Sequence, residues 1–219
     1  MKVKKGATVA VLGKTGAGKS TLAYLLTRLY DPTSGRILID GQDITDIARS
    51  HIRQNVATVL QEPFLFSKSI ISNIRIANPN ASEEEVYKAA RIADIHDNIL
   101  SFKQGYETPV GEKGVTLSGG QRQRLAIART IINKAPILIF DDSLSAVDTE
   151  TDINIRTALK KRSEETTTFI ITHRIATAKD ADLIVVLENG TISEQGTHEQ
   201  LIKKKGLYQR VYEIQTKLE

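Results

Sequence analysis

"GKTGAGKS", residues 13–20, follows the apolar run "ATVAVL" (7–12) and opens the helical pattern "KSTLAYLLTRLY" (19–30). The motif is Gly, any four residues, then Gly-Lys-Ser, placed between an expected strand and an expected helix. Glycines let the backbone N–H groups of such a loop turn toward phosphate oxygens, and the helix N-terminus adds partial positive charge. The sequence therefore predicts a phosphate-binding loop. Its expected residues are Gly13, Lys14, Thr15, Gly16, Ala17, Gly18, Lys19, Ser20 and Thr21.

Two side chains of this loop have specific expected roles. Lys19 would reach the β- and γ-phosphates of a nucleotide, and the Ser20 hydroxyl would ligate Mg²⁺. A later strand, "ILIFD", ends at Asp141 and is typical of a Walker B strand, whose carboxylate holds Mg²⁺ through water. Asp142 follows directly, and two carboxylates at the end of a buried strand repel each other unless a cation neutralises them. Mg²⁺ and Lys19 would supply that neutralisation.

Strand and helix patterns alternate along the chain except in its middle. Apolar strands separated by helices predict a mainly parallel sheet covered on both faces, which is an α/β fold. Residues 62–135 are mostly helical, and Ser82 with Glu85 forms an expected capping box there. We therefore expect an α/β core from residues 1–61 and 136–219, with a helical part inserted. The expected strands after the first are "RILID", "VATVL", "APILIF", "TTFIIT" and "DLIVVL", with a helix "ITDIARSHIRQ" and a hairpin turn "ENGT".

Composition excludes several classes of protein. The 219 residues contain no Cys, so neither a disulfide framework nor a thiolate metal site is available. Every apolar run is far too short to span a bilayer, and no signal-peptide pattern opens the sequence. The net charge of +4 is typical of an ordinary solvated surface, while an anionic ligand or a membrane surface remains open. No nucleic-acid partner is expected.

A second glycine-containing motif, "LSGGQRQRLAIAR" (117–129), distinguishes among proteins with phosphate-binding loops. This stretch resembles the signature of the nucleotide-binding domains of ATP-binding-cassette (ABC) transporters, and the resemblance covers essentially the whole chain. It implies a P-loop NTPase (RecA-like) core, ATP with Mg²⁺ as ligands, and an inserted helical signature subdomain. It also implies that two such domains clamp two nucleotides head to tail. The residues implied to contact the partner's ATP are Ser118, Gly119, Gly120 and Gln121.

Other elements of the family follow in order. Gln61 matches the Q-loop glutamine, which contacts Mg²⁺ and the attacking water, and "SAVD" (145–148) matches the D-loop at the dimer interface. His173 matches the switch histidine that touches the γ-phosphate. Asp142 occupies the position of the residue that polarises the water. The resemblance thus implies Gln61, Asp142 and His173 as catalytic residues, and Ser20, Gln61 and Asp141 as metal ligands.

Two stretches indicate the exporter subclass. "QEPFLFSKSIISNI" (61–74) resembles the region where an exporter domain receives its transmembrane domain, and "TPVGEKG" (108–114) resembles the exporters' X-loop. The resemblance therefore implies a transmembrane partner that contacts these segments. It places the domain at the cytoplasmic face of the cell membrane, in a transporter of drug-like or lipid substrates.

The sequence departs from the family in two places. No aromatic residue precedes the phosphate-binding loop to stack on adenine, so we expect the N-terminal antiparallel β part to be truncated. Asp142 stands where the family usually has glutamate, and a misplacement of about 1 Å can cost on the order of 100-fold in rate. The resemblance then suggests the slow half of a heterodimer, whose partner carries the competent glutamate.

Three alternatives differ in class or subclass. The chain could be a nucleotide-gated clamp that dimerises with almost no hydrolysis, or an importer ATPase subunit. DNA-repair and chromosome ATPases share these motifs but separate the first from the signature by a long coiled coil, which this short chain lacks.

Overall fold

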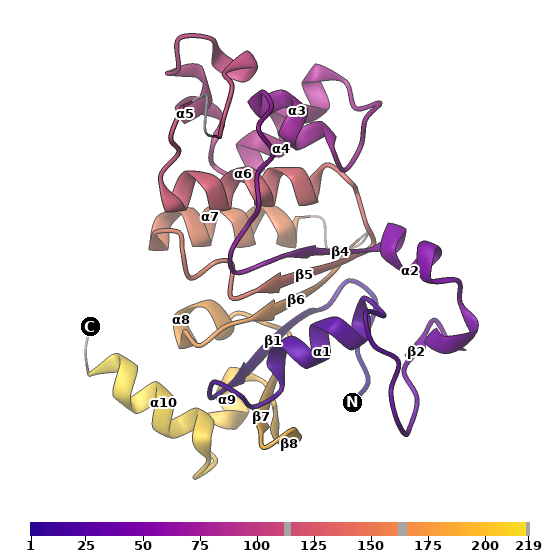
Figure 1. Cartoon of the computed structure of the whole chain (residues 1–219). Helices are drawn as coiled ribbons and strands as arrows, with labels where there is room; N and C mark the ends of the chain where they lie inside the picture. The colour runs from indigo at the N-terminus through magenta and orange to yellow at the C-terminus, as the bar shows by residue number, and fades with distance from the viewer. Residues whose placement is uncertain (112–114, 162–165, 218–219) are drawn as a thin grey trace. The chain divides into compact units, whose positions relative to one another are not determined.

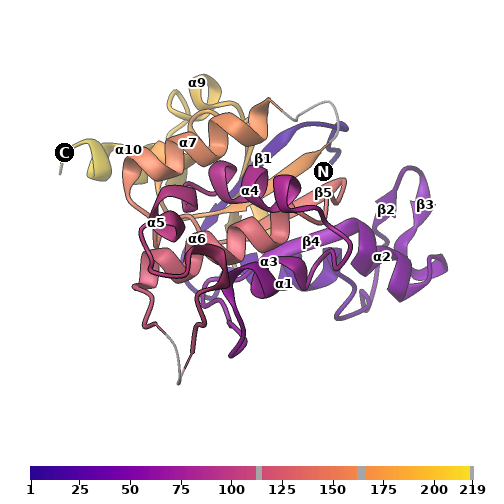
Figure 2. The ribbon, with the colours of Figure 1, turned by 90° about the horizontal axis from the view of Figure 1, so that it is seen from above.

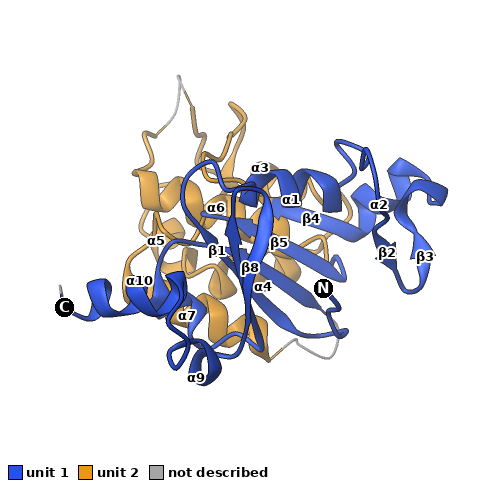
Figure 3. Ribbon diagram, turned by 90° about the horizontal axis from the view of Figure 1, so that it is seen from below, with its two compact units in different colours: residues 1–58, 135–142, 163–219 blue, residues 59–134, 143–162 orange. Residues whose placement is uncertain are grey.

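The computed structural model describes residues 1–111, 115–161 and 166–217, which form two compact units (Figures 1 and 3). Unit 1 comprises residues 1–58, 135–142 and 163–219, and unit 2 comprises residues 59–134 and 143–162. This division differs from the expected one mainly in residues 143–162. They group with the inserted helices, and the helix within them contacts a helix of the insert.

The sheet has six strands in the order β4-β5-β6-β1-β7-β8 (Figure 1). In this sheet β1 pairs in parallel with both β6 and β7, β5 pairs in parallel with β6, and β7 pairs antiparallel with β8. The predicted α/β fold with a mainly parallel sheet is therefore confirmed. The strand bounds are β1 Thr8–Gly13, β4 Val56–Val59, β5 Ile137–Asp141, β6 Thr167–Ile171, β7 Leu183–Glu188 and β8 Thr191–Gly196.

Apolar side chains cover both faces of this sheet. Successive residues of a strand point to opposite faces, and β1 accordingly sends Val9 and Val11 into one cluster and Ala10 and Leu12 into another. The first cluster includes Ala23 of a following helix, and the second includes residues from three C-terminal helices. Full burial of an aliphatic side chain contributes about 1.5–3 kcal/mol. Burial on both faces explains why the central strands are continuous apolar runs. The same packing holds the carboxyl ends of these strands in fixed positions relative to one another.

The remaining elements of unit 1 differ in detail from the expected ones. The expected helix over 44–54 is split, because Ile47 and Ala48 have extended backbone angles and Asp43 caps the turn before them. The helix after β1 ends early, where Thr27 bonds back to Ala23 and Tyr24. The elements are α1 Lys19–Leu26, β2 Leu38–Ile39, β3 Gln42–Asp43, η1 Ile44–Asp46, α2 Arg49–Asn55, α8 Ile175–Ala178, α9 His198–Leu201 and α10 Leu207–Thr216.

The predicted hairpin joins β7 to β8. Asn189 and Gly190 at its tip have φ values of 50° and 77°. A two-residue hairpin turn of type I′ needs positive φ at both central positions, which Asn and Gly tolerate best. The "ENGT" prediction is confirmed.

The regular elements of unit 2 are mostly helices in its described residues, and its α6 packs against α3 and α4 (Figure 2). The capping box predicted for α4 is present: Ser82 accepts from the backbone of Glu85, whose carboxylate accepts from the Ser82 N–H. No helix within the described ranges is both long and apolar enough to cross a membrane. The elements are α3 Ile70–Arg75, α4 Glu83–Ile92, α5 His96–Leu100, η2 Gly105–Glu107, α6 Gly119–Ile131 and α7 Thr149–Lys160.

Candidate functional site

The predicted phosphate-binding loop of unit 1 joins β1 to α1. A Cβ atom at Gly13 would lie 2.5 Å from the carbonyl oxygen of Leu187, so only glycine fits where the loop leaves the sheet. Gly18 is the N-cap of α1, has φ of 98°, and provides no side-chain cap. The first N–H groups of α1 are therefore not taken by a capping side chain. A helix start of this kind favours an anion.

Lys19 folds back over the same loop. Its Nζ donates to the carbonyl oxygens of Gly13, at 2.8 Å, and Lys14, at 3.0 Å. These are neutral acceptors in a partly solvated place, so a phosphate would compete with them for the ammonium by adding charge. The loop thus combines a cation with backbone donors in one small region.

Asp141 ends β5 beside the first turn of α1. The Ser20 hydroxyl donates to Asp141 Oδ1 over 3.4 Å, and only 8% of the residue's surface is exposed. Burial raises the pKa of Asp141, the neighbouring Asp142 carboxylate raises it further, and the Ser20 hydrogen bond and Lys19 act against both. The buried carboxylate is therefore short of compensating positive charge.

This donor set fits Mg²⁺. Mg²⁺ prefers oxygen ligands, keeps several waters and is usually bound by one or two side chains together with substrate phosphates. Ser20 and Asp141 provide two such oxygens next to the loop. Within the described residues, no group of three or more His, Cys, Asp or Glu side chains could hold a metal without such help.

Asp142 and His173 meet at the same edge of the sheet. His173 Nδ1 lies 3.1 Å from Asp142 Oδ1, and the histidine side chain is 61% exposed. Asp142 has φ of 49°, a left-handed conformation that Asp tolerates better than most residues. Its N–H still bonds to Ile171 of β6. The His173 carbonyl accepts from Gln215 of α10, which fixes the loop after β6.

The signature residues lie in unit 2 at the start of α6. Ser118 is the N-cap and accepts from the Gln121 N–H, while the Gln121 side chain accepts from the Ser118 N–H. Gly119 and Gly120 form the first turn, and a Cβ on Gly120 would lie 3.6 Å from the carbonyl oxygen of Ala146 in the 145–148 loop. Unit 2 therefore brings the signature and the D-loop stretch together.

The other predicted segments also lie in unit 2. Gln61 is exposed in an irregular stretch after β4. Of the predicted X-loop, residues 108–111 are described, and the remaining 112–114 lie outside the described residues.

Sequence reasoning missed a polar chain that ends at the D-loop stretch. The Thr151 hydroxyl lies 2.8 Å from carboxylate oxygens of both Asp148 and Asp94, and Arg124 of α6 donates to the Asp94 carbonyl oxygen at 2.8 Å. Asp94 has φ of 54°. No local pattern signals such a chain, because its members come from three separate segments.

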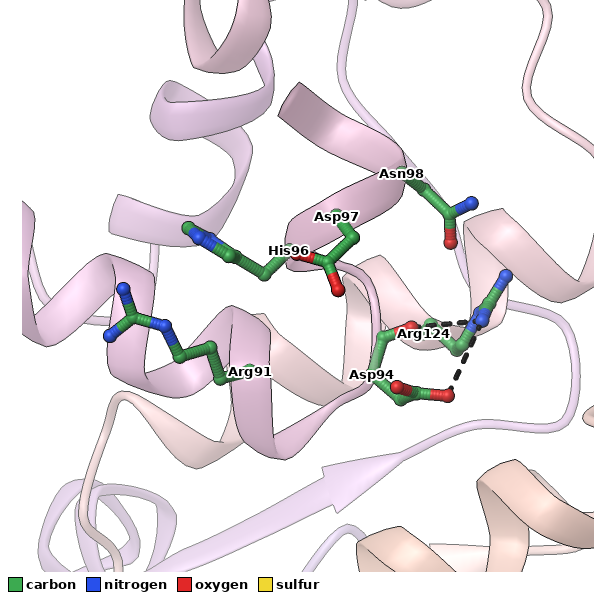
Figure 4. Close-up of a pocket in the computed structure, with 6 residues that line it drawn as sticks. All are labelled: Arg91, Asp94, His96, Asp97, Asn98 and Arg124. Atoms are coloured by element: carbon green, nitrogen blue, oxygen red, sulfur yellow. Dashed lines mark hydrogen bonds and ion pairs between the residues drawn. The ribbon is translucent and has the colours of Figure 1, made fainter. Parts of the chain in front are cut away.

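A depression of about 310 Å³ lies beside this chain (Figure 4). Figure 4 shows Arg91 and His96 extending away from the Arg124–Asp94 pair, so the basic groups do not converge on one point. His96 instead bonds to the Tyr106 hydroxyl at 2.8 Å. The depression therefore has the character of a polar surface hollow and lacks the features of a built anion site.

A parallel α/β sheet, a glycine loop at a strand-to-helix turn, and a lysine next to a Ser–Asp pair define a P-loop nucleoside-triphosphate-binding domain. Residues 1–145 match the family described as ABC transporter, and the chain belongs to this family. It is thus an ABC-type ATP-binding domain.

Relatives and solved structures agree with this assignment. The chain is 49% identical over 215 residues to YgaD of Bacillus subtilis (strain 168), named as a multidrug export ATP-binding/permease protein. A similarly named protein of Staphylococcus aureus (strain NCTC 8325 / PS 47) is also 49% identical. Each match covers 98% of this chain and 37% of the relative. A solved bacterial Atm1-family ABC exporter with ATP bound superposes with a TM-score of 0.93 at 45% identity, over 97% of this chain and 37% of that one.

Proposed function

We propose that the chain binds MgATP with unit 1 and hydrolyses it at a head-to-tail interface with a second nucleotide-binding domain, powering export by a transmembrane part. The observation that carries this proposal is the Ser20–Asp141 pair beside the Lys19 loop. It supports the proposal because a cation, backbone donors and two oxygens of the kind that bind Mg²⁺ lie close together there. The rest of the chemistry follows from neighbouring groups.

Different residues of the chain have different proposed roles in binding and hydrolysing MgATP. The backbone N–H groups of residues 13–20 hold the phosphates, and Lys19 exchanges its two carbonyl partners for β- and γ-phosphate oxygens. Ser20, Asp141 and Gln61 would hold Mg²⁺, which neutralises phosphate charge when bound. Asp142 and Gln61 would orient the attacking water, and His173 would contact the γ-phosphate. Ser118 and the two glycines after it would donate to ATP on the partner domain.

Asp142 supports the proposal that ATP hydrolysis is slow at this chain's own site. Its carboxylate is one methylene shorter than the glutamate that the family resemblance leads us to expect, and it already contacts His173. A misplacement of about 1 Å can cost on the order of 100-fold in rate. We therefore propose that the chain pairs with a different subunit whose site is faster. A clamp that dimerises with almost no turnover is the alternative that this same feature favours.

The transmembrane partner is proposed from the surface of residues 61–74 and from the relatives. Phe64 and Phe66 are 67% and 42% exposed, which is unusual for aromatic side chains without a partner. The relatives' names combine an ATP-binding and a permease function, and this chain spans only 37% of their length. Their names also favour an exporter over an importer. The proposed location is the cytoplasmic face of the cell membrane, and the proposed substrates are drug-like or lipid molecules.

Mixing two defective variants tests the shared-site geometry. Lys19→Ala removes the phosphate cation, and Ser118→Arg blocks the signature, so each variant alone should lack MgATP-dependent dimerisation and hydrolysis. In a mixed dimer, one site joins the intact loop of one chain to the intact signature of the other. Single-turnover hydrolysis should return to roughly half of the unaltered value, since only mixed dimers form and each has one complete site out of two.

The outcomes separate the hypotheses. If the unaltered chain dimerises with MgATP and mixing still gives no recovery, the signature serves its own chain's nucleotide, which contradicts the head-to-tail proposal. Recovery of dimerisation in light scattering without hydrolysis would favour the clamp.

A further inference from the structure

Residues 60–69 form an irregular segment, here called the arm, that contains no helix or strand. It presents Phe64 and Phe66, whose rings meet edge to face with centroids 5.0 Å apart, and the exposed Leu60. A segment without secondary structure must find other partners for its backbone carbonyl groups. The conformation of the arm therefore depends on whichever side chains supply these hydrogen bonds.

Two of these donors come from α6. Gln123, which is buried, donates through Nε2 to the Leu60 carbonyl oxygen at 3.1 Å. Arg129 donates to the Phe64 carbonyl oxygen at 2.9 Å, and burial lowers the pKa of its guanidinium. The first half of the arm is thus fixed to the signature helix.

The second half is held by one fully buried amide, that of Asn73 in α3. Its Oδ1 accepts from the Phe66 N–H at 2.9 Å. Its Nδ2 lies within hydrogen-bonding distance of three carbonyl oxygens: those of Phe66 at 3.0 Å, Lys68 at 3.3 Å and Ser69 at 3.1 Å. One buried amide thus contacts four backbone groups of a segment that has no strand pairing of its own, although its two N–H hydrogens are shared among the three carbonyl oxygens.

The same stretch is paired with the described part of the X-loop. Val110 donates to the Lys68 carbonyl oxygen at 3.0 Å, and Ile70 donates to the Thr108 carbonyl oxygen at 3.0 Å. The Lys68 carbonyl oxygen thus has both the Asn73 amide and the Val110 N–H as donors. The two segments that resemble exporter contact regions therefore form one hydrogen-bonded structure within unit 2.

We infer that Asn73 is a positioning residue: it sets the conformation of the arm and its pairing with residues 108–111, so that Phe64 and Phe66 form a preformed docking surface for the transmembrane part. This inference rests on the proposed function. Ordering a free segment on binding costs conformational entropy, and a segment held beforehand avoids that cost. Asn is suited to this role because it both donates and accepts. Asp keeps the size and the acceptor but has no N–H groups for the three carbonyls.

Asn73→Asp, Gly111→Ala and Asn80→Asp form the test set. Gly111→Ala disturbs the pairing from the other segment, because its Cβ would lie 2.7 Å from Ser67 Oγ at a φ of 102°. Asn80→Asp makes the same charge change at an exposed position of unit 2 and is the matched control. Each chain is added to vesicles containing the transmembrane portion of the Bacillus subtilis relative. Binding to these vesicles, affinity for a fluorescent ATP analogue and amide exchange of residues 66–70 are then measured.

Asn73→Asp and Gly111→Ala should weaken vesicle binding about tenfold or more while ATP affinity stays within about twofold. They should also speed amide exchange in residues 66–70, whereas Asn80→Asp should change none of these. Vesicle binding that falls only in proportion to ATP affinity would mean a purely structural role and would overturn the inference. If Asn73→Asp does not fold, the same comparison for Gly111→Ala decides. Failure of the unaltered chain to bind would overturn the docking proposal itself, and the positioning role with it.

Discussion

The phosphate-binding loop and the signature both contain glycines and both begin a helix, but they differ in whether a side chain caps the first backbone N–H groups of that helix. The helix after the phosphate-binding loop starts at Gly18, which has no side chain to cap it. The signature helix starts at Ser118, whose hydroxyl and partner Gln121 form a reciprocal capping box. Both motifs are rich in glycine, yet only the first leaves its N-terminal donors without a cap.

This difference indicates two different uses of a helix N-terminus. An uncapped start with a lysine folded over it can bind a phosphate by itself, because it supplies both donors and charge. The N-terminus of the signature helix already has a cap, because the Ser118 hydroxyl oxygen accepts from the backbone. The hydrogen of that hydroxyl can still be donated to another group. This agrees with the proposal that the signature adds a few donors to a nucleotide that another loop holds.

The largest expected effect concerns the charge of the first loop. Lys19→Ala should lower ATP affinity by on the order of 100-fold or more, because two charge-assisted contacts to phosphate are lost. Equilibrium binding of a fluorescent ATP analogue measures this, with circular dichroism to verify the fold. Lys14→Ala is the matched control, since Lys14 is exposed and contributes its backbone carbonyl to the loop. Equal losses in both variants would remove the special role of Lys19.

Much of the fold could be predicted because its signals are local. The strands β1, β5 and β7 are continuous apolar runs, and the Ser82–Glu85 capping box and the Asn189–Gly190 turn depend only on neighbouring residues. Such patterns report backbone geometry directly. The α/β sheet and most element positions followed from them.

Other features of the structure differ from the sequence predictions or could not be predicted. The apolar spacing of residues 44–54 predicted one helix, but this helix is interrupted at Ile47. Asp43 caps a short turn before Ile47, and the backbone at Ile47 is extended. The Asn73 contacts could not be predicted, because their acceptors are carbonyl groups of a non-periodic segment. The motifs predict that Asp141 and Ser20 lie close together. The raised pKa of Asp141 could not be predicted, because it depends on how deeply the folded chain buries the carboxylate. The chemical roles of these residues remain predictions.

The next expected effect concerns Asp142. Asp142→Glu should raise single-turnover hydrolysis by up to about 100-fold, the scale of a 1 Å misplacement. Asp142→Asn should cost little, because a poorly placed group has little catalysis to lose. The measurement uses a dimer whose other site has been disabled by Lys19→Ala. If Asp142→Asn removes nearly all activity and Asp142→Glu adds none, aspartate is the competent residue and the slow-site proposal fails.

The capping boxes allow a smaller but sharper test of the comparison. Ser118→Ala and Ser82→Ala each remove one N-cap hydroxyl from unit 2 and should each cost about 1 kcal/mol of stability in thermal unfolding. Neither should change the chain's own ATP affinity. Only Ser118→Ala should also weaken MgATP-dependent dimerisation, measured by light scattering. Equal dimerisation by the two variants would mean that the signature hydroxyl acts only as a cap.

The smallest expected effect is the pH dependence that Asp141 gives to the nucleotide-free chain. Burial and the Asp142 carboxylate raise the pKa of Asp141 above its unfolded value. The folded chain then binds this proton more tightly than the unfolded chain. The resulting stability is fully present below the unfolded pKa and is lost as pH rises through the higher folded pKa. Asp141→Asn cannot ionise, so its melting temperature minus that of the unaltered chain should be larger at pH 7 than at pH 4. The effects of the other titrating groups on the melting temperature are the same in both chains and cancel in this difference. A difference that is constant with pH, or larger at pH 4, would mean that Ser20 and Lys19 already compensate the buried charge without Mg²⁺.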